Sequence, residues 1–253
     1  MRSFLFKAIF AVLALGSVPY AFADSAQAPK SIRLMTVDEL EKAGDAMRAL
    51  KDFPEALRYF QEALRRDRRN ASIHNKLGLT HVSNGDMDAA RRSFENAIRH
   101  KPNYPDALNN LGVVYFKERY FSDAARYFSR AIALEETRAA FHVNLGVALF
   151  NQRRIEQAMM QYARALELDP EVLWRSSSIG ITAQIAGPED RGRFFFELAR
   201  IQAQRDALED CLRCLQLAKD NNYSRLADVY GDELFRFLWD DERLHEIVAP
   251  PAT

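Results

Sequence analysis

Two cysteines in the C-terminal part of the chain have a spacing that can serve redox chemistry. Cys211 and Cys214 form a C-x-x-C motif, which acts in redox proteins when the first thiolate lies at a helix N-terminus and is stabilised by the helix dipole. We expect residues 207–210 to be helical already, with no strand before them. Cys211 also occupies a position where small residues pack between helices. We therefore favour buried packing, with a local disulfide or a redox role as the alternative.

Histidines and neighbouring acidic residues are the other candidates for chemistry. His74 and His81 are seven residues apart and would lie on one helical face, but the sequence places no third donor for a metal site. We interpret both, together with His142, as half-buried packing residues. Glu135 and Glu136, at a predicted helix end, fit a solvated face better than an acid/base pair.

Composition and motifs exclude several classes of function. No phosphate-binding loop, Gly-x-Ser-x-Gly elbow or His-Glu-x-x-His motif occurs in the sequence. The 35 Lys and Arg residues balance the 35 Asp and Glu residues, so no electrostatic grip on nucleic acid is indicated. The sequence therefore predicts a protein that is not an enzyme, uses no metal or cofactor and does not bind nucleic acid.

The elements that would position these side chains follow a repeat of 34 residues. Each glycine is followed after twelve residues by a small residue, after sixteen by an aromatic one and after nineteen by an alanine. The glycine column holds Gly44, Gly78, Gly112, Gly146 and Gly180, and the aromatic column holds Phe60, Phe94, Phe128, Tyr162 and Phe196. Each repeat is predicted to be two antiparallel helices that approach closely where Gly112 faces Ala124. Because one repeat cannot bury its apolar face alone, the repeats must stack.

This repeat resembles the tetratricopeptide repeat. The family's first-helix pattern reads here as Leu108, Leu111, Gly112 and Tyr115, and its second-helix pattern as Ala90, Phe94 and Pro102. The first copy departs from the pattern at Ala43 and Arg68, and the third at Glu136. The resemblance implies an all-α fold, a right-handed superhelical solenoid of antiparallel helix pairs with a degenerate helical C-terminal cap.

Four copies cover residues 37–70, 71–104, 105–138 and 139–172, and degenerate helices with a cap are expected over 173–248. Residues 173–206 fit a fifth repeat in phase. If Ala199 is instead counted in the glycine column, Cys211 falls in the small-residue column and Leu215 in the aromatic column of a following helix. Both interpretations share a helix near residues 190–203 and both stay open. We also expect a closing helix or helix pair over 232–248, a disordered lead-in over 24–36 and a disordered tail over 249–253.

The resemblance also implies a binding surface, because relatives bind ligands on the concave face of their first helices. In repeats two to four the columns facing that side hold Asn75, Leu79, Val82, Asn109, Asn110, Val113, Phe116, Val143, Asn144, Val147 and Phe150. Asparagine offers both a donor and an acceptor and so matches a peptide unit. The alternative is that asparagine is merely common there and that the apolar residues pack on neighbouring helices. Relatives that clamp a C-terminal carboxylate use Lys and Arg in these columns, whereas the first repeat here has Glu41 and Asp45.

The N-terminus reads as a secretory signal peptide over residues 1–23. Arg2 and Lys7 flank an uncharged apolar stretch at 8–18, and Ala21-Phe22-Ala23 supplies the small-x-small cleavage pattern. The apolar stretch is too short to span a bilayer comfortably. We expect a periplasmic or secreted protein without stable membrane insertion after cleavage, and an uncleaved N-terminal anchor is the alternative.

These observations predict an exported, non-catalytic adaptor or scaffold that binds a peptide segment or partner protein in its concave groove. The alternative is an accessory subunit of an envelope polysaccharide or cell-wall assembly machine. An extended apolar peptide should depend on Phe116 and Phe150. A glycan should depend more on the polar residues of the groove.

Overall fold

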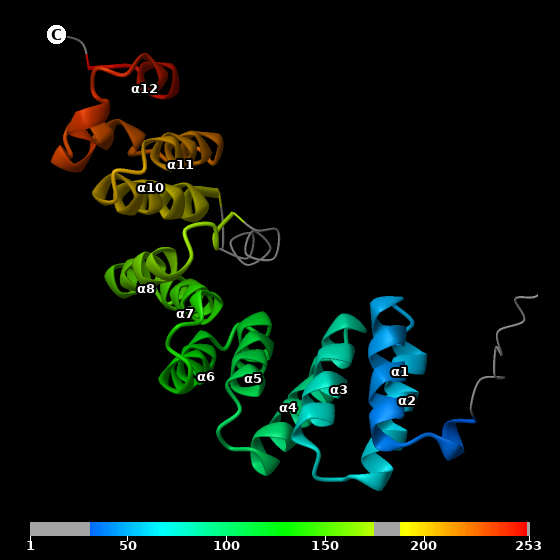
Figure 1. Cartoon of the computed structure of the whole chain (residues 1–253). Helices are drawn as coiled ribbons and strands as arrows, with labels where there is room; N and C mark the ends of the chain where they lie inside the picture. The colour runs from blue at the N-terminus through cyan, green and yellow to red at the C-terminus, as the bar shows by residue number, and fades with distance from the viewer. Residues whose placement is uncertain (1–30, 175–187, 252–253) are drawn as a thin grey trace, which may run out of the picture. The chain divides into compact units, whose positions relative to one another are not determined.

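A computed structural model of the chain describes residues 31–174 and 188–251 (Figure 1). Within these ranges every regular element is helical, which confirms the all-α expectation, and no described helix is long and apolar enough to cross a membrane. Residues 1–35 and 36–253 form separate units. Of the first unit only residues 31–35 are described. They contain a 3-10 turn, η1 (Ile32–Leu34). The predicted signal peptide lies outside the described residues.

Four helix pairs follow the 34-residue repeat. They are α1 (Val37–Ala49) with α2 (Phe53–Arg66), α3 (Ala71–Ser83) with α4 (Met87–His100), α5 (Pro105–Lys117) with α6 (Phe121–Leu134), and α7 (Ala139–Asn151) with α8 (Ile155–Leu168). The second helix of each pair packs on the first helix of the next, and successive first helices also touch one another. This stacking buries apolar faces between neighbouring repeats, as a solenoid requires, in several hydrophobic clusters.

Local chemistry sets the helix ends. The hydroxyl of Thr36 accepts a hydrogen bond from the Glu39 N–H at 3.2 Å, and the Glu39 carboxylate accepts one from the Thr36 N–H at 2.6 Å, which is a capping box at the start of α1. The turn within each repeat has one residue in the left-handed region. That residue is Gly85 in the second repeat and Lys51, Arg119 or Arg153 at the equivalent positions of the others. Glycine adopts this conformation without the steric cost that lysine or arginine bears.

The tightest contact in each pair joins the glycine column to the aromatic column. A Cβ on Gly112 would lie 2.7 Å from Cε1 of Phe128, and the corresponding distance at Gly78 is 2.5 Å, from Phe94. The nearest neighbour of Gly112 is thus the Phe128 ring, four residues after the predicted partner, Ala124. The space is occupied by the ring of Phe128, which is buried. The close approach itself is confirmed.

Beyond residue 187 the helices pair in a different register. α10 (Pro188–Gln204) packs along α11 (Leu208–Asp220), which is the interpretation that places Ala199 in the glycine column. The first helix of an in-phase fifth repeat would fall mainly on residues 175–187, outside the described residues. Two 3-10 helices, η2 (Leu226–Tyr230) and η3 (Glu233–Leu238), and the short α12 (Glu242–Ile247) follow α11. Phe235 and Leu244 are buried there, so these elements enclose apolar surface at the end of the stack.

Candidate peptide-binding surface

The predicted asparagines form pairs between adjacent repeats. Asn110 Nδ2 donates to Asn75 Oδ1 at 3.0 Å, and Asn144 Nδ2 donates to Asn109 Oδ1 at 2.8 Å. Each bond joins residues 35 positions apart and so links neighbouring first helices. Within the described part of the chain, no hydrogen bond engages Asn109 Nδ2 or Asn110 Oδ1. One donor and one acceptor thus remain beside each other on α5.

Apolar residues of repeats two and three border these asparagines and stay partly accessible. Leu79 and Val82 on α3 and Val113 on α5 are half-buried. Phe116 is only 7% exposed, and its ring lies 5.3 Å from that of Phe121. The accessible apolar surface is therefore aliphatic, and Phe116 serves mainly to pack α5 on α6.

The fourth repeat differs, because its predicted groove residues lie in the core. Val143, Val147 and Phe150 are 1%, 0% and 2% exposed. The ring of Phe150 meets that of Phe194 on α10 edge to face, with the centroids 5.4 Å apart. These three side chains have almost no surface left for a ligand. Phe150 therefore packs on a neighbouring helix, which was the alternative to a role as a ligand anchor.

The first repeat adds a cluster of charges that the sequence analysis missed. Lys76 Nζ lies 2.7 Å from a carboxylate oxygen of Glu41 and 2.5 Å from one of Asp45. Ser72 donates to the Glu41 carboxylate at 3.2 Å. Both acids on α1 are therefore held by residues of α3. These ion pairs could have been predicted from the sequence, because their spacings of 31 and 35 residues are close to one repeat.

The cysteines are buried, free thiols in the α10–α11 pair. Cys211 Sγ donates to the Ala199 carbonyl at 3.4 Å. Burial raises the pKa of Cys211 to about 12 and raises the pKa of Cys214 further, so neither forms a thiolate at neutral pH. α11 begins at Leu208, closer to Cys211 than predicted, yet desolvation outweighs any help from the helix dipole. The geometry fits packing rather than redox exchange.

The histidines are held by hydrogen bonds and stacking. His74 stacks on His100 with ring centroids 5.5 Å apart, and its Nε2 lies 3.1 Å from the Arg68 carbonyl. Burial lowers the pKa of His74 and of His81. His142 is more deeply buried than predicted. Among the described residues, no three side chains come together as metal ligands.

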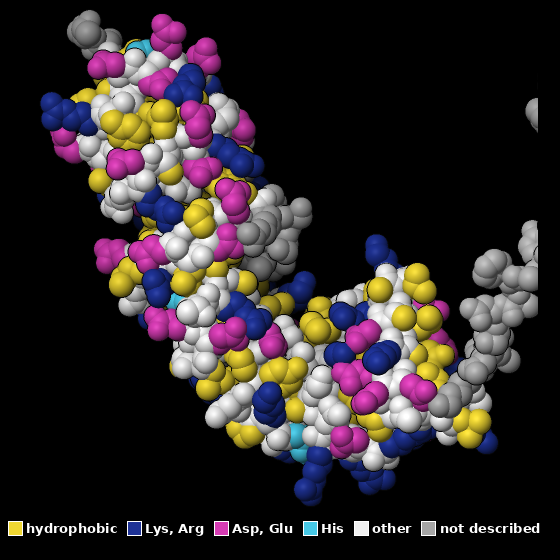
Figure 2. All heavy atoms as spheres, in the orientation of Figure 1, with side chains coloured by type: hydrophobic (Ala, Val, Ile, Leu, Met, Phe, Trp, Pro, Cys, Tyr) yellow, Lys and Arg dark blue, Asp and Glu magenta, His cyan; other side chains and the backbone are white. Residues whose placement is uncertain are grey.

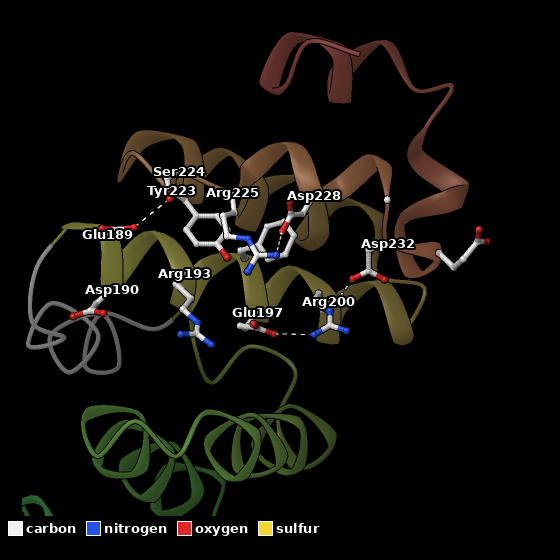
Figure 3. Close-up of a pocket in the computed structure, with 13 residues that line it drawn as sticks. Glu189, Asp190, Arg193, Glu197, Arg200, Tyr223, Ser224, Arg225, Asp228 and Asp232 are labelled. Carbon is white, nitrogen blue, oxygen red and sulfur yellow. Dashed lines mark hydrogen bonds and ion pairs between the residues drawn. The ribbon is translucent and has the colours of Figure 1, made fainter. Parts of the chain in front are cut away.

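A polar hollow of about 760 Å³ lies between α10 and the segment that contains η2 and η3 (Figure 3). Arg193, Phe196 and Arg200 line it from one face of α10. Arg200 is 3.1 Å from Glu197 and 2.8 Å from Asp232. The lining residues include six carboxylates and three guanidinium groups, so the hollow has a negative net charge. Figure 2 shows the same mixture more widely, with basic and acidic side chains interspersed over the visible face.

The comparisons agree with the repeat pattern. A tetratricopeptide repeat family model matches residues 40–91 and 115–172, and a second TPR repeat model matches 80–118. The chain therefore carries tetratricopeptide repeats. Among curated proteins, none matches it in sequence.

Solved structures with a similar fold include three with high coverage. One crystal structure of MamA has a TM-score of 0.52 at 20% identity, covering 70% of this chain and 93% of that one. MamA 41-end from Desulfovibrio magneticus RS-1 has a TM-score of 0.54 at 18% identity, with coverages of 74% and 97%. YrrB has a TM-score of 0.51 at 21% identity, with coverages of 82% and 90%. These likenesses show the TPR solenoid fold, which is a scaffold fold.

Proposed function

We propose that the chain is a non-catalytic adaptor that binds an extended peptide segment of a partner protein on α3 and α5. The observation that carries this proposal is the free donor and acceptor of Asn109 and Asn110 beside half-buried aliphatic side chains. Asn109 Nδ2 would donate to a peptide carbonyl, and Asn110 Oδ1 would accept from a peptide N–H. YrrB, described as a TPR protein with an unusual peptide-binding site, supports the proposal by fold likeness.

The preferred ligand side chain follows from the walls of the surface. Leu79, Val82 and Val113 offer aliphatic contact without a deep pocket, so alternate residues of an extended segment would lie on them. The asparagine side chains would hydrogen-bond to the peptide backbone and so fix the direction of the segment. The contact energy would come mainly from the apolar side chains.

The test uses a partner captured from envelope extract, whose bound segment is then made as a synthetic peptide. Replacing Leu79, Val82 and Val113 together by alanine should weaken peptide binding by roughly tens of fold, as titration calorimetry would measure. Asn109→Ala should cost about 0.5–1.5 kcal/mol. Leu134→Ala is the matched control, because Leu134 is an apolar residue of α6 with 43% exposure.

The outcome separates three possibilities. If the triple variant keeps its helical circular dichroism and its affinity, the surface on α3 and α5 is not the site. Loss of binding in Asn109→Ala without loss in the triple variant would indicate that the peptide binds through its polar groups rather than through apolar side chains. Loss in Leu134→Ala alone would move the site to the second helices.

Export is a second part of the proposal and rests on the first 23 residues. The charged flank, the apolar stretch and Ala21-Phe22-Ala23 favour cleavage after Ala23. Edman sequencing of the protein from a periplasmic or culture-medium fraction should then read Asp24 first. An intact Met1 in that fraction would contradict cleavage.

A further inference from the structure

A hollow of about 570 Å³ lies between the second helices α6 and α8. Leu145 and Leu149 of α7 are among the residues that line it. Ser129 on α6 and Gln157 on α8 are among its polar lining residues. This hollow is separate from the surface on α3 and α5, so a ligand bound in it would be independent of the peptide site proposed above.

The same place one repeat earlier is filled by tyrosines. Between α4 and α6, Tyr115 stacks on Tyr127 with ring centroids 5.3 Å apart and an interplanar angle of 6°. Tyr120 meets Tyr115 edge to face at 6.4 Å. The residues 34 positions later are Leu149, Gln161 and Arg154, and all three line the hollow. The three tyrosine rings are therefore a feature of the junction between α4 and α6, because the residues 34 positions earlier, His81, Asp86 and Ser93, are not tyrosines either.

The charges change in the same way. The junction between α4 and α6 has four carboxylates, Asp88, Glu95, Glu118 and Asp123, and the residues 34 positions later are Ser122, Ser129, Gln152 and Gln157. At the earlier junction Arg91 pairs with Asp88 and, at 3.4 Å, with Glu118. Its counterpart in the hollow is Ala125. Four acids and one base of the junction between α4 and α6 therefore correspond to neutral side chains in the hollow.

Two guanidinium groups, those of Arg126 and Arg154, line the hollow without a carboxylate among the lining residues. Arg126 pairs with Asp123, outside the lining, at 2.8 Å. In the described part of the chain Arg154 is hydrogen-bonded by its side chain only to the neutral amide of Gln152, at 3.4 Å. The potential of the hollow is therefore positive.

We propose that this hollow binds an acidic peptide segment carrying an aromatic side chain. The ligand would supply what the neighbouring junction has from its own chain, namely a ring and carboxylates. The ring would lie on Leu145 and Leu149 beside Met160, which is 67% exposed and whose sulfur makes favourable contacts with aromatic edges. Carboxylates on either side of the ring would pair with Arg154 and Arg126. The serine and glutamine side chains would bond to the peptide backbone.

The test measures binding of three acetylated, amidated pentapeptides to the 15N-labelled protein by NMR. Gly-Glu-Tyr-Glu-Gly is the probe, because it has one carboxylate on either side of the ring. Gly-Glu-Ala-Glu-Gly removes the ring, and Gly-Lys-Tyr-Lys-Gly reverses the charge. We expect saturable shifts at Ser129, Leu149 and Gln161 with the probe. Binding of the other two should be about fivefold weaker or less detectable.

Two variants decide the assignment. Leu149→Tyr restores the residue of the earlier junction and should fill the hollow, while Arg154→Glu reverses an exposed charge without touching the core. Each should reduce the shifts at Ser129 and Gln161 by about tenfold at a fixed probe concentration. Leu134→Ala, on α6 but outside the lining, should bind as the parent does.

Any of three results would overturn the proposal. The first is the absence of saturable shifts at the hollow with the tyrosine–glutamate probe. The second is unchanged binding in both Leu149→Tyr and Arg154→Glu. The third is a set of shifts centred on Leu79 and Val113, which would assign the acidic peptide to the surface on α3 and α5 instead.

Discussion

The four repeats and the α10–α11 pair make the same two-helix contact with different side chains. In the repeats a glycine faces an aromatic ring so closely that a Cβ on Gly78 would lie 2.5 Å from Phe94. In the last pair Ala199 already has a Cβ, and the aromatic column holds Leu215, with both residues fully buried. The residue in the glycine column is larger in the pair whose residue in the aromatic column is smaller. The two columns are therefore coupled by volume rather than fixed separately.

The two regions also differ in what they leave accessible. On α3 and α5 three of the predicted groove residues, Leu79, Val82 and Val113, are half-buried aliphatic side chains. On α7 the equivalent positions hold Val147 and Phe150, which are buried where the stack meets α10. A column position thus predicts the direction of a side chain. Its exposure depends on the element that comes next.

The largest expected effect is at this meeting of the two regions. Phe150→Ala should destabilise the protein by about 3–5 kcal/mol, because it removes a ring that packs on Phe194 and leaves a cavity. Urea unfolding followed by circular dichroism measures this change. Val113→Ala is the comparison and should cost about 1 kcal/mol or less, since Val113 is half-buried. A Phe150→Ala cost similar to that of Val113→Ala would mean that α7 presents its side chain to solvent.

A smaller effect tests the volume coupling itself. Gly112→Ala should destabilise the protein by about 1–3 kcal/mol, because its Cβ would lie 2.7 Å from the Phe128 ring. Phe128→Leu alone should cost about 1–2 kcal/mol through lost packing. The double variant would recreate the Ala199–Leu215 combination of the last pair and should be more stable than the two single costs predict. Purely additive costs would show that the columns are not coupled.

Much of the fold could be predicted because the helices of the repeats are local and periodic. The second helices α4 and α6 begin at Met87 and Phe121, which are 34 residues apart as the repeat requires. The sequence did not predict the contact that joins a repeat to a helix outside the repeat register. Phe150 has the column of a groove residue, but its partner, Phe194, lies on a helix outside the repeat register.

The asparagine pairs could be predicted only by considering two neighbouring positions of the repeat together. Asn75 with Asn110 and Asn109 with Asn144 are 35 residues apart, one repeat plus one residue. Considering the two neighbouring positions of each first helix that hold asparagine together would have predicted these bonds between successive first helices. It would also have shown which amide atoms remain available for a ligand. The hollow between α6 and α8 could be found the same way, by comparing each residue with the one 34 positions earlier.

The smallest expected effect tests whether the α10–α11 pair opens separately from the four repeats. Cys211 and Cys214 are the only cysteines of the chain and lie in the α10–α11 pair, so thiol reactivity reports on that pair alone. With the pKa of Cys211 raised to about 12, the native thiol should react with a disulfide reagent at pH 8 roughly a thousandfold more slowly than the unfolded chain. Reaction must then follow opening of the pair. In a urea series, the thiols should become reactive at a lower concentration than that which unfolds the repeats. The reason is that a repeat array gains its stability from its neighbours, and the contact between α8 and α10 is smaller than the contacts that join successive repeats. Single Cys211→Ala and Cys214→Ala variants assign the signal to each thiol. Fast reaction in the absence of urea would contradict the packing, and reactivity that coincides with the loss of helical signal would show that the two regions unfold as one unit.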